Sequence, residues 1–527
     1  MNPFQFKLSR RALFKGGIAG LGAISGAAAY RSLGGAAVPS GKPVEEAIYR
    51  GIYEDLGKYI LLSPQKLGGG THAVDLSKQK TLAWISYWNY GDSCPISHHL
   101  AAFHSDSGDP YKGFEFINST QGGDNILMYG LNTRIRENGM LGQFGQGNHI
   151  YRVGYDGKIG QMELLEDVAE TTGLGLGVHT VPFPDGTGFA VGDGQKDIAA
   201  LFTRARGHEK TKVQTAFRAD WVPNAKNLGD NWIKGGKIIL TRLTASLDLG
   251  RFDLMGTKGN KINYEMAPMA ELLVERGQIP GDSPSTLTGL DFCLHDPRGR
   301  YSLMGTRMCG GAFVLDRQNM EPICFIQANE GSNDNFAVRK ISGNPDTWEV
   351  VLPAVGNPIH ETGFHPDGAR LCMMNNLRAN NVAVFDTSAA DPRQWKRITF
   401  VKDDEWKGEY PSPFHLNYSI DGTKCFFTVL RPKPMKSDVV VVDTKTWKII
   451  KKFRNVGVDC QTTCTTYDGK YAIVIFSGFQ RMEVGAFVFR QDTLEQVGYM
   501  PNFGGHHDCV IVPATVDQLK YSRSCTV

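Results

Sequence analysis

A turn that recurs along the chain most constrains how this sequence of 527 residues can fold. Asp-Gly pairs begin at Asp185, Asp367, Asp421 and Asp468, and a short hydrophobic run typical of a strand follows each of them. The last three are separated by 54 and 47 residues, near the repeat length of a propeller blade. Each pair is typical of the hairpin turn between the innermost and second strands of a blade. The sequence therefore predicts an all-β fold, a β-propeller whose short antiparallel strands bury their faces between neighbouring blades.

Two additions to the propeller are expected, and we assign the propeller itself to residues 81–527. An i, i+3, i+4 apolar pattern within residues 44–58 predicts a short N-terminal helical segment, which belongs to an extension over residues 38–80. The stretch 210–281 fits the blade pattern less well. Pro268 to Arg276 within it is typical of a helical loop insertion, with the proline in its first turn.

Residues 1–37 are typical of an export signal. Arg10 and Arg11 fit the twin-arginine pattern, and a weakly apolar Gly/Ala-rich run over 16–29 is too short and too polar for a stable membrane anchor. We expect cleavage between residues 29 and 38, folding before export, and a periplasmic location. This segment has five basic residues and no acidic one, so its removal takes the formal net charge from +3 to about −2 (+3 minus 5). Such a charge does not favour a nucleic-acid partner.

The ten cysteines are scattered, and none forms a C-x-x-C pair, so zinc ribbons and thioredoxin-like chemistry are not expected. Several stand in strand-like runs, for example Cys372 and Cys425. We expect most of them to be buried free thiols.

Histidines and one aspartate recur at a fixed offset before the turns. The residues six or seven positions ahead of a turn are His99, His179, Asp291, His360 and His415, where the turn after Asp291 is the degenerate pair Arg298-Gly299. A residue at this offset begins the innermost strand of a blade, at one mouth of the central channel. Each histidine alone could equally be a hydrogen-bonded core residue. Together with the adjacent His98 they predict a nitrogen-rich metal site, and imidazole suits copper, zinc, iron and nickel. His506, with His507 as a close alternative, precedes a strand-like run and adds one further ligand.

The block from His98-His99 to Asn118, with the run Asp-Pro-Tyr-Lys-Gly-Phe-Glu-Phe-Ile-Asn at its end, resembles the double-histidine motif of nitrous oxide reductase propellers. It is more similar to that of the copper-containing thiocyanate dehydrogenase family, and the resemblance covers most of the chain after residue 37. It implies a seven-bladed propeller with three copper ions on its axis. It also implies oxidation of thiocyanate to cyanate and sulfur, with electrons passed to an external acceptor such as a c-type cytochrome. A homodimer is one possible assembly.

The resemblance also implies roles for individual residues. The copper ligands that it implies are His98, His99, His179, His360, His415 and His506. It makes Asp291 the active-site aspartate and gives catalytic roles to Lys66 and Glu265, which sequence alone would leave as loop charges.

One departure from the family leaves alternatives open. The family has a further histidine on the next-to-last blade, but residues 458–464 of this chain contain none. Either Cys460 replaces it, since thiolate binds Cu(I) well, or the site holds fewer metals. No cupredoxin-like segment follows, which argues against nitrous oxide reduction. Another multicopper propeller oxidoreductase of that type and a non-catalytic copper-binding or interaction propeller are the alternative functions.

Overall fold

Short antiparallel strands make up almost all of the structure, which is a computed structural model. The residues that it describes are 59–65, 70–76, 80–86, 95–103, 114–122, 147–153, 162–172, 174, 176, 179–193, 198–204, 210–224, 235–243, 288–307, 309–328, 334–357, 359–375, 379–406, 411–431, 436–458, 460–466, 468–476, 485–500 and 509–513. All of them belong to one unit, Arg50–Val527. The predicted export signal, the helical segment within 44–58 and the insertion at Pro268 to Arg276 lie outside the described residues.

The strands form seven antiparallel sheets. Each sheet is described from one edge to the other, so that strands named one after another are hydrogen-bonded to each other. The first sheet contains β3 (Lys80–Ser86), β2 (Gly70–Asp75), β1 (Tyr59–Gln65) and β32 (Val510–Pro513). The second contains β4 (Pro95–Phe103), β5 (Phe114–Gly122), β6 (Gly147–Val153) and β7 (Met162–Asp167). The third contains β8 (His179–Pro182), β9 (Gly188–Asp193), β10 (Ile198–Thr203), β11 (Lys212–Pro223), β12 (Gly236–Leu243), β19 (Thr347–Leu352) and β18 (Arg339–Lys340).

The fourth sheet contains β13 (Leu290–His295), β14 (Tyr301–Thr306), β15 (Gly311–Asp316), β16 (Pro322–Gln327) and β17 (Asn335–Ala337). The fifth contains β20 (Ile359–Phe364), β21 (Arg370–Asn375), β22 (Asn381–Asp386) and β23 (Lys396–Val401). The sixth contains β24 (Ser412–Tyr418), β25 (Lys424–Leu430), β26 (Ser437–Asp443) and β27 (Lys448–Gly457). The seventh contains β28 (Cys460–Thr465), β29 (Tyr471–Phe476), β30 (Gly485–Arg490) and β31 (Gln496–Met500).

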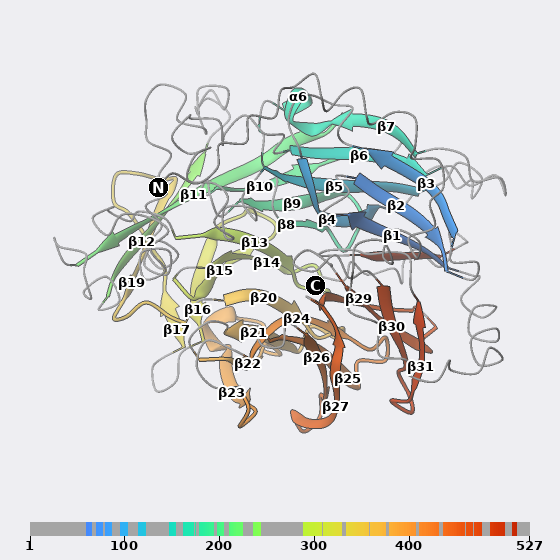
Figure 1. The fold of residues 1–527 in the computed structure, drawn as a ribbon. Helices are drawn as coiled ribbons and strands as arrows, with labels where there is room; N and C mark the ends of the chain where they lie inside the picture. Colours follow the sequence, from blue (N-terminus) through green and yellow to red (C-terminus); the bar gives the residue numbers. More distant parts are fainter. Residues whose placement is uncertain are drawn as a thin grey trace, which may run out of the picture. The chain divides into compact units, whose positions relative to one another are not determined.

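The sheets are arranged as blades around a common axis (Figure 1). One end strand of each sheet contacts that of the next, in the order β4, β8, β13, β20, β24, β28 and β32, and β32 contacts β4 again. These are the innermost strands, and the prediction of a seven-bladed β-propeller is confirmed. The ring closes in the first sheet, where β1 pairs with β32 and Tyr59 lies opposite Pro513.

The predicted boundary at residue 81 is wrong, because β1 and β2 already belong to the first blade. The third blade is extended: β12 continues from β11, and β19 returns from beyond the fourth blade to pair with it. This extension explains why residues 210–281 fit the blade pattern poorly. The described helical segments are α6 (Val168–Thr172) and η6 (Pro392–Gln394). No helix in the part of the chain that the structure describes is long and apolar enough to cross a membrane.

The recurring turns lie where the sequence predicts them. They join β8 to β9, β13 to β14, β20 to β21, β24 to β25 and β28 to β29. Each glycine has a φ between 69° and 72°, and its N–H donates to the carbonyl three residues earlier; the five are Gly186, Gly299, Gly368, Gly422 and Gly469. Glycine adopts this left-handed conformation without the steric cost that a Cβ brings. The turn around Asp106 lies outside the described residues.

The core lies between neighbouring blades. The two strands of a blade nearest the axis are well buried: the innermost strand β13 and the second strands β9 and β29 are buried at every position. The outermost strand β27 is largely exposed or half-buried. Between the fifth and sixth blades, for example, Met374, Val384, Leu416 and Phe427 belong to one apolar cluster. The eight cysteines that the structure describes are all buried as thiols, which confirms the expectation for these eight.

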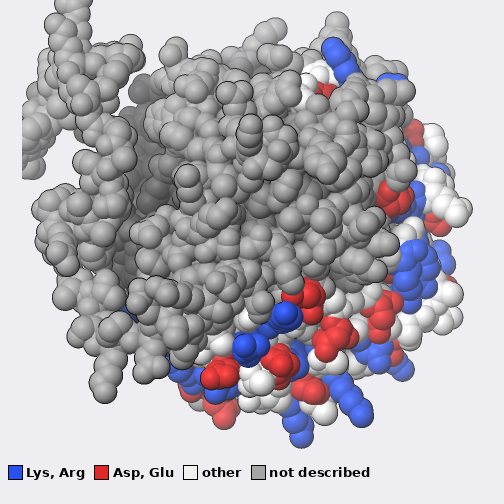
Figure 2. All heavy atoms as spheres, turned by 90° about the vertical axis from the view of Figure 1, so that its right-hand side faces the viewer, with Lys and Arg blue, Asp and Glu red and all other residues white. Residues whose placement is uncertain are grey.

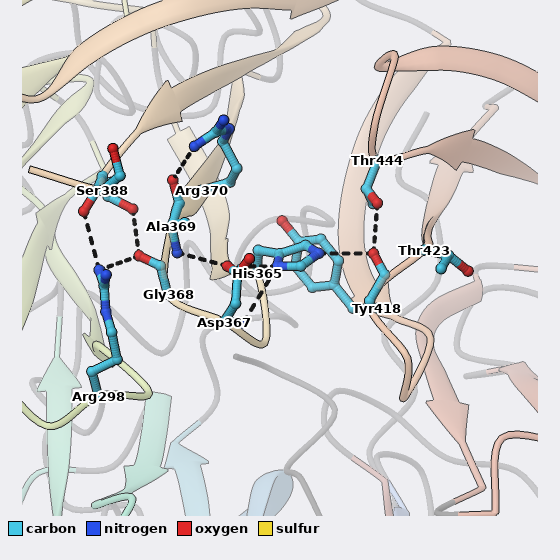
Figure 3. Close-up of polar contacts among 12 residues, drawn as sticks. Arg298, His365, Asp367, Gly368, Ala369, Arg370, Ser388, Tyr418, Thr423 and Thr444 are labelled. Carbon is cyan, nitrogen blue, oxygen red and sulfur yellow. Dashed lines mark hydrogen bonds and ion pairs between the residues drawn. The ribbon is translucent and has the colours of Figure 1, made fainter.

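Hydrogen bonds from turn to turn link the fourth, fifth and sixth blades (Figure 3). The Arg298 guanidinium donates to the carbonyls of Gly368 and Thr387. The Nε2–H of His365 then donates to the Gly422 carbonyl over 2.8 Å. The turns therefore hold neighbouring blades together in addition to reversing the chain.

Gly368→Ala is expected to lower the midpoint of thermal unfolding more than Gly469→Ala does. Both glycines have nearly the same φ, 69° and 72°, so both alanines carry about 1–2 kcal/mol of left-handed strain. A Cβ at Gly368 would also lie 2.5 Å from Arg298 Nε and 2.6 Å from Asp296 Oδ1, whereas at Gly469 nothing lies within 4 Å. Equal midpoints for the two variants would show that the contact between the turns adds no stability.

A network of ion pairs connects the fifth and sixth blades at a greater distance from the axis. Asp438, with a side chain only 2% exposed, accepts from Arg431 Nη2 at 2.6 Å and from Arg454 Nη1 at 2.9 Å. Glu405, beyond β23, pairs with the same two arginines, and its hydrogen bond from Arg454 lowers its pKa to about 2. On the described part of the face in Figure 2, acidic and basic side chains are likewise interspersed.

Candidate metal centre

Five buried polar residues lie on the innermost strands of five blades. Four of them, His99, His179, Asp291 and His415, are predicted from the sequence, and the fifth is Glu361. His99 is on β4, His179 begins β8, Asp291 is on β13, Glu361 is on β20 and His415 is on β24. All five side chains are buried, with at most 4% of each residue exposed. The fixed offset before the turns therefore does select residues at one level of the inner strands.

β-Bulges occur at this same level of five inner strands. The pairing with the second strand of the blade shifts by one residue in β4 between Ser97 and Leu100, in β13 between Leu290 and Phe292, in β20 between Ile359 and Thr362, in β24 between Pro413 and His415, and in β28 between Cys460 and Thr462. A bulge bends the strand and re-aims its side chains, and bulges are common beside active sites. The repeated irregularity sets the direction of the side chains at the axis.

His99, His179 and Glu361 converge on one point. One ligand atom of each lies within 4.8 Å of the other two. The two imidazole rings are 4.2 Å apart between centroids and inclined by 70°, and His179 Nε2 is 3.9 Å from Glu361 Oε1. Three separate blades therefore supply three potential metal donors.

Asp291 orients His179. The Nδ1 of His179 lies 2.9 Å from the main-chain carbonyl of Asp291 and donates to it, since a carbonyl can only accept. This leaves Nε2, on the side of Glu361, as the nitrogen with a lone pair. The Asp291 carboxylate in turn accepts from Arg307 Nη1 at 3.0 Å.

Burial shifts the pKa values of the cluster toward neutral forms. Burial lowers the pKa of His179, partly opposed by the charge of Asp291, and it lowers the pKa of His415 to about 3, with a smaller contribution from His179. Burial and then the charge of Asp291 raise the pKa of Glu361 well above its usual value. Near neutral pH both imidazoles are therefore uncharged, which is the form that binds metals.

The donor set fits a metal ion. Two imidazole nitrogens and a carboxylate oxygen suit zinc, copper or iron, and do not by themselves select one of them. A metal-binding histidine usually donates its second ring N–H to a carbonyl or carboxylate, as His179 does to Asp291. His99, His179 and Glu361 are the residues that would hold the ion.

The remaining predicted residues divide into two groups. His98 and His360 lie on β4 and β20, and only their main chain is described. Lys66, Glu265, His506 and His507 lie outside the described residues. Their assigned roles stay predictions.

Glu361 was missed at the sequence level, where its neighbour His360 was chosen instead. A signal was available, because Glu361 stands six residues before Asp367. His179 and His415 stand at the same offset before Asp185 and Asp421. His360 shares an offset of seven with His99, so the offset alone admits both residues of β20.

Cys460 does not lie at the level of the histidines. It belongs to an apolar cluster between the sixth and seventh blades that includes Phe426, Val474 and Phe476. Thr462 is the residue six positions before Asp468, so a threonine occupies the histidine offset in this blade. The replacement of the family histidine by Cys460 is not supported by this position.

A small pocket lies beside the three donors. His99, His179 and Glu361 line it on one side, and Val181, Phe292 and Leu294 are among its apolar walls. It has room for about one water-sized species. A ligand there would touch both the donors and an apolar wall.

Gly192→Ala is expected to disturb the orientation of His179. A Cβ at Gly192 would lie 2.3 Å from the Asp291 carbonyl oxygen, which accepts the bond from His179. The main chain at Asp291 would have to move, and we expect metal affinity to fall about 10- to 100-fold, as for other changes to a ligand's supporting hydrogen bond. Metal titration of the purified variant checks this, and an unchanged affinity would mean that β13 can shift without loss. Gly469→Ala is the control, because it adds a methyl far from the cluster.

No family model matches this chain, and no curated protein matches it. Among solved structures, the periplasmic gluconolactonase of Pseudomonas aeruginosa is similar, with 12% identity, a TM-score of 0.50, and coverage of 86% of this chain and 99% of that one. The chain is a β-propeller. Dihydro-heme d1 dehydrogenase NirN matches the propeller with 13% identity and a TM-score of 0.44, over 89% of this chain and 77% of that one. Hydrazine synthase of Kuenenia stuttgartiensis has 16% identity and a TM-score of 0.29; the match covers 40% of this chain and 48% of that chain. At these identities the likeness concerns the fold alone.

Proposed function

We propose that this protein is a copper-dependent oxidoreductase that converts thiocyanate to cyanate and sulfur. The observation that carries the proposal is the convergence of His99, His179 and Glu361 on the propeller axis. The choice of copper, of three ions and of thiocyanate rests on the resemblance of the block that begins at His98-His99. Export to the periplasm by the twin-arginine route, a c-type cytochrome as electron acceptor and a possible homodimer belong to the same proposal.

The proposed reaction balances with water as the only co-substrate besides the acceptor. Thiocyanate and one water give cyanate, one sulfur atom, two protons and two electrons. The carbon–sulfur bond breaks and a carbon–oxygen bond forms. The electrons leave to the external acceptor.

Copper, when bound, would accept the electrons and lower the pKa of a water molecule. The residues of the chain would hold the metal ion and orient its ligands. Asp291 keeps the Nε2 of His179 directed toward Glu361. Burial raises the pKa of Glu361 and so favours its protonated form when no cation is bound; it would bind the ion as a carboxylate.

Apolar side chains beside the donors would shield the metal site from bulk water. Val181, Phe292 and Leu294 are the residues that do so. By the resemblance, Lys66 would hold the anion as a point charge and Glu265 would accept a proton. General-base assistance of this kind contributes about 10² to 10⁴ in rate.

Metal analysis and a turnover assay test the proposal on protein exported with its own leader. We expect close to three copper ions per chain and reduction of a c-type cytochrome that requires thiocyanate. Fewer than two coppers would exclude the trinuclear centre. Copper without thiocyanate-dependent reduction would leave a different copper oxidoreductase or a non-catalytic copper-binding propeller.

A further inference from the structure

An arginine lies beside the axial cluster, held between the two innermost strands that carry Asp291 and Glu361. The N–H of Arg307 donates to the carbonyl of Gly289 at 2.6 Å, just before β13. The carbonyl of Arg307 accepts from the N–H of Ile359 at 3.1 Å, the first residue of β20. The main chain at Arg307 thus bridges the fourth and fifth blades and fixes the position of its side chain.

Among the described residues, the guanidinium of Arg307 makes one contact with the cluster and uses one of its N–H groups for it. Its Nη1 donates to Asp291 Oδ2 at 3.0 Å, and its side chain is 17% exposed. This is a single contact rather than the two-pronged pairing that an arginine fork can make with a carboxylate. Arg298 at the turns is different, since it donates to Asp296, Gly368 and Thr387. Among the described residues, Arg307 therefore has donors left over.

Arg307 brings a positive charge to within one residue of the cluster. Its guanidinium contacts the carboxylate of Asp291, and the main-chain carbonyl of the same Asp291 accepts from His179. A fixed positive charge beside a cation site weakens cation binding by Coulomb repulsion. Such a charge has a clear use if the site also takes an anion.

We propose that Arg307 is an anion-binding residue, which receives a small monoanion beside the axial cluster with the N–H groups that no described residue accepts from. The identity of the anion as thiocyanate rests on the proposed function. Arginine suits this task because it stays charged at all relevant pH values and is more weakly hydrated than lysine. Asp291 then has two roles, since it orients His179 by its carbonyl and Arg307 by its carboxylate.

Equilibrium binding of thiocyanate, measured by calorimetry with the electron acceptor omitted, tests the inference. Arg307→Gln is expected to raise the dissociation constant about 10- to 100-fold, the loss typical of a hydrogen bond to a charged group. Arg307→Lys keeps the charge and should recover part of the affinity. Arg218→Gln is the matched control, because Arg218 is an exposed arginine on β11 whose ion-pair partner among the described residues is Asp220, and the affinity of this variant should equal that of the wild type.

Arg307→Gln leaves the buried Asp291 carboxylate without its cation, so this variant risks poor folding. The double variant Arg307→Gln/Asp291→Asn removes both charges and is compared with Asp291→Asn alone. A further tenfold or greater loss of thiocyanate affinity in the double variant supports the inference. Affinities within twofold of each other, or no binding by the wild type, would overturn it.

The inference and the proposed function can fail separately. Binding that depends on Arg307 without any turnover leaves the anion site standing and removes the thiocyanate oxidation. If turnover occurs, Arg307→Gln should raise KM with little change in kcat. Turnover with an unchanged KM and an unchanged dissociation constant would remove Arg307 from anion binding and leave the activity in place.

Discussion

His179→Ala is expected to abolish tight metal binding and, with it, turnover. His179 is the central donor of the cluster, since its ring lies 4.2 Å from that of His99 and its Nε2 lies 3.9 Å from Glu361. Loss of a supporting hydrogen bond already costs about 10- to 100-fold in metal affinity, so loss of the ligand itself should cost on the order of 100-fold or more. Metal titration of the purified variant, followed by metal analysis after dialysis, measures the effect.

His295→Ala is the matched control. His295 is a buried histidine on β13, bonded to Ser302 at 2.9 Å and packed edge-on against Phe183. Burial lowers its pKa to about 3, so it is neutral as His179 is. Both variants lose a buried imidazole and should lose thermal stability, but only His179→Ala should lose the metal. Equal metal content in the two variants would show that the axial cluster is not the binding site.

Glu361→Gln is expected to separate metal binding from stability. Burial raises the pKa of Glu361 and favours a neutral carboxyl group in the metal-free protein, so we expect a neutral amide of the same shape to leave the midpoint of thermal unfolding of that form nearly unchanged. The amide cannot become an anionic ligand. Metal affinity should therefore fall by about 10-fold or more, and stabilisation of the protein by added metal should shrink accordingly.

Glu166→Gln should show the opposite behaviour. Glu166 is also buried, but it is bonded to Arg204 and to the N–H and hydroxyl of Thr211, at 2.9 and 3.0 Å for the latter two. Glu166→Gln removes one charge of the buried ion pair with Arg204, which costs about 3–5 kcal/mol, while metal affinity stays as in the wild type. A stable Glu361→Gln variant with normal metal affinity would exclude Glu361 as a ligand.

The fold was predictable because its signal is local and repeated. Each recurring turn has a left-handed glycine, four of the five follow an aspartate, and the last three Asp-Gly pairs stand at nearly regular spacing in the sequence. The first blade lacked this signal. Its β1 pairs with β32, a partner more than 400 residues away, so no local pattern marks Tyr59 as the start of the propeller.

The candidate site was only partly predictable. Counting back from the turns found His99, His179, Asp291 and His415 on inner strands. It did not find Glu361, the neighbour of His360 on β20, where the strand carries a bulge between Ile359 and Thr362. A bulge breaks the two-residue alternation on which a choice between neighbouring residues depends. Arg307 does not stand at a position that recurs relative to the turns. Its place follows only from the main-chain hydrogen bond between Arg307 of the fourth blade and Ile359 of the fifth.

The pairing of β1 with β32 also determines the order of assembly. The first blade cannot be completed until residues 510–513 have been synthesised. β4, which carries His99, also contacts β32, so the surroundings of this strand are complete only when the ring has closed. Closing a ring over so long a sequence separation is slow compared with forming a hairpin. Until β32 docks, β1 has an unpaired edge, and such edges promote aggregation.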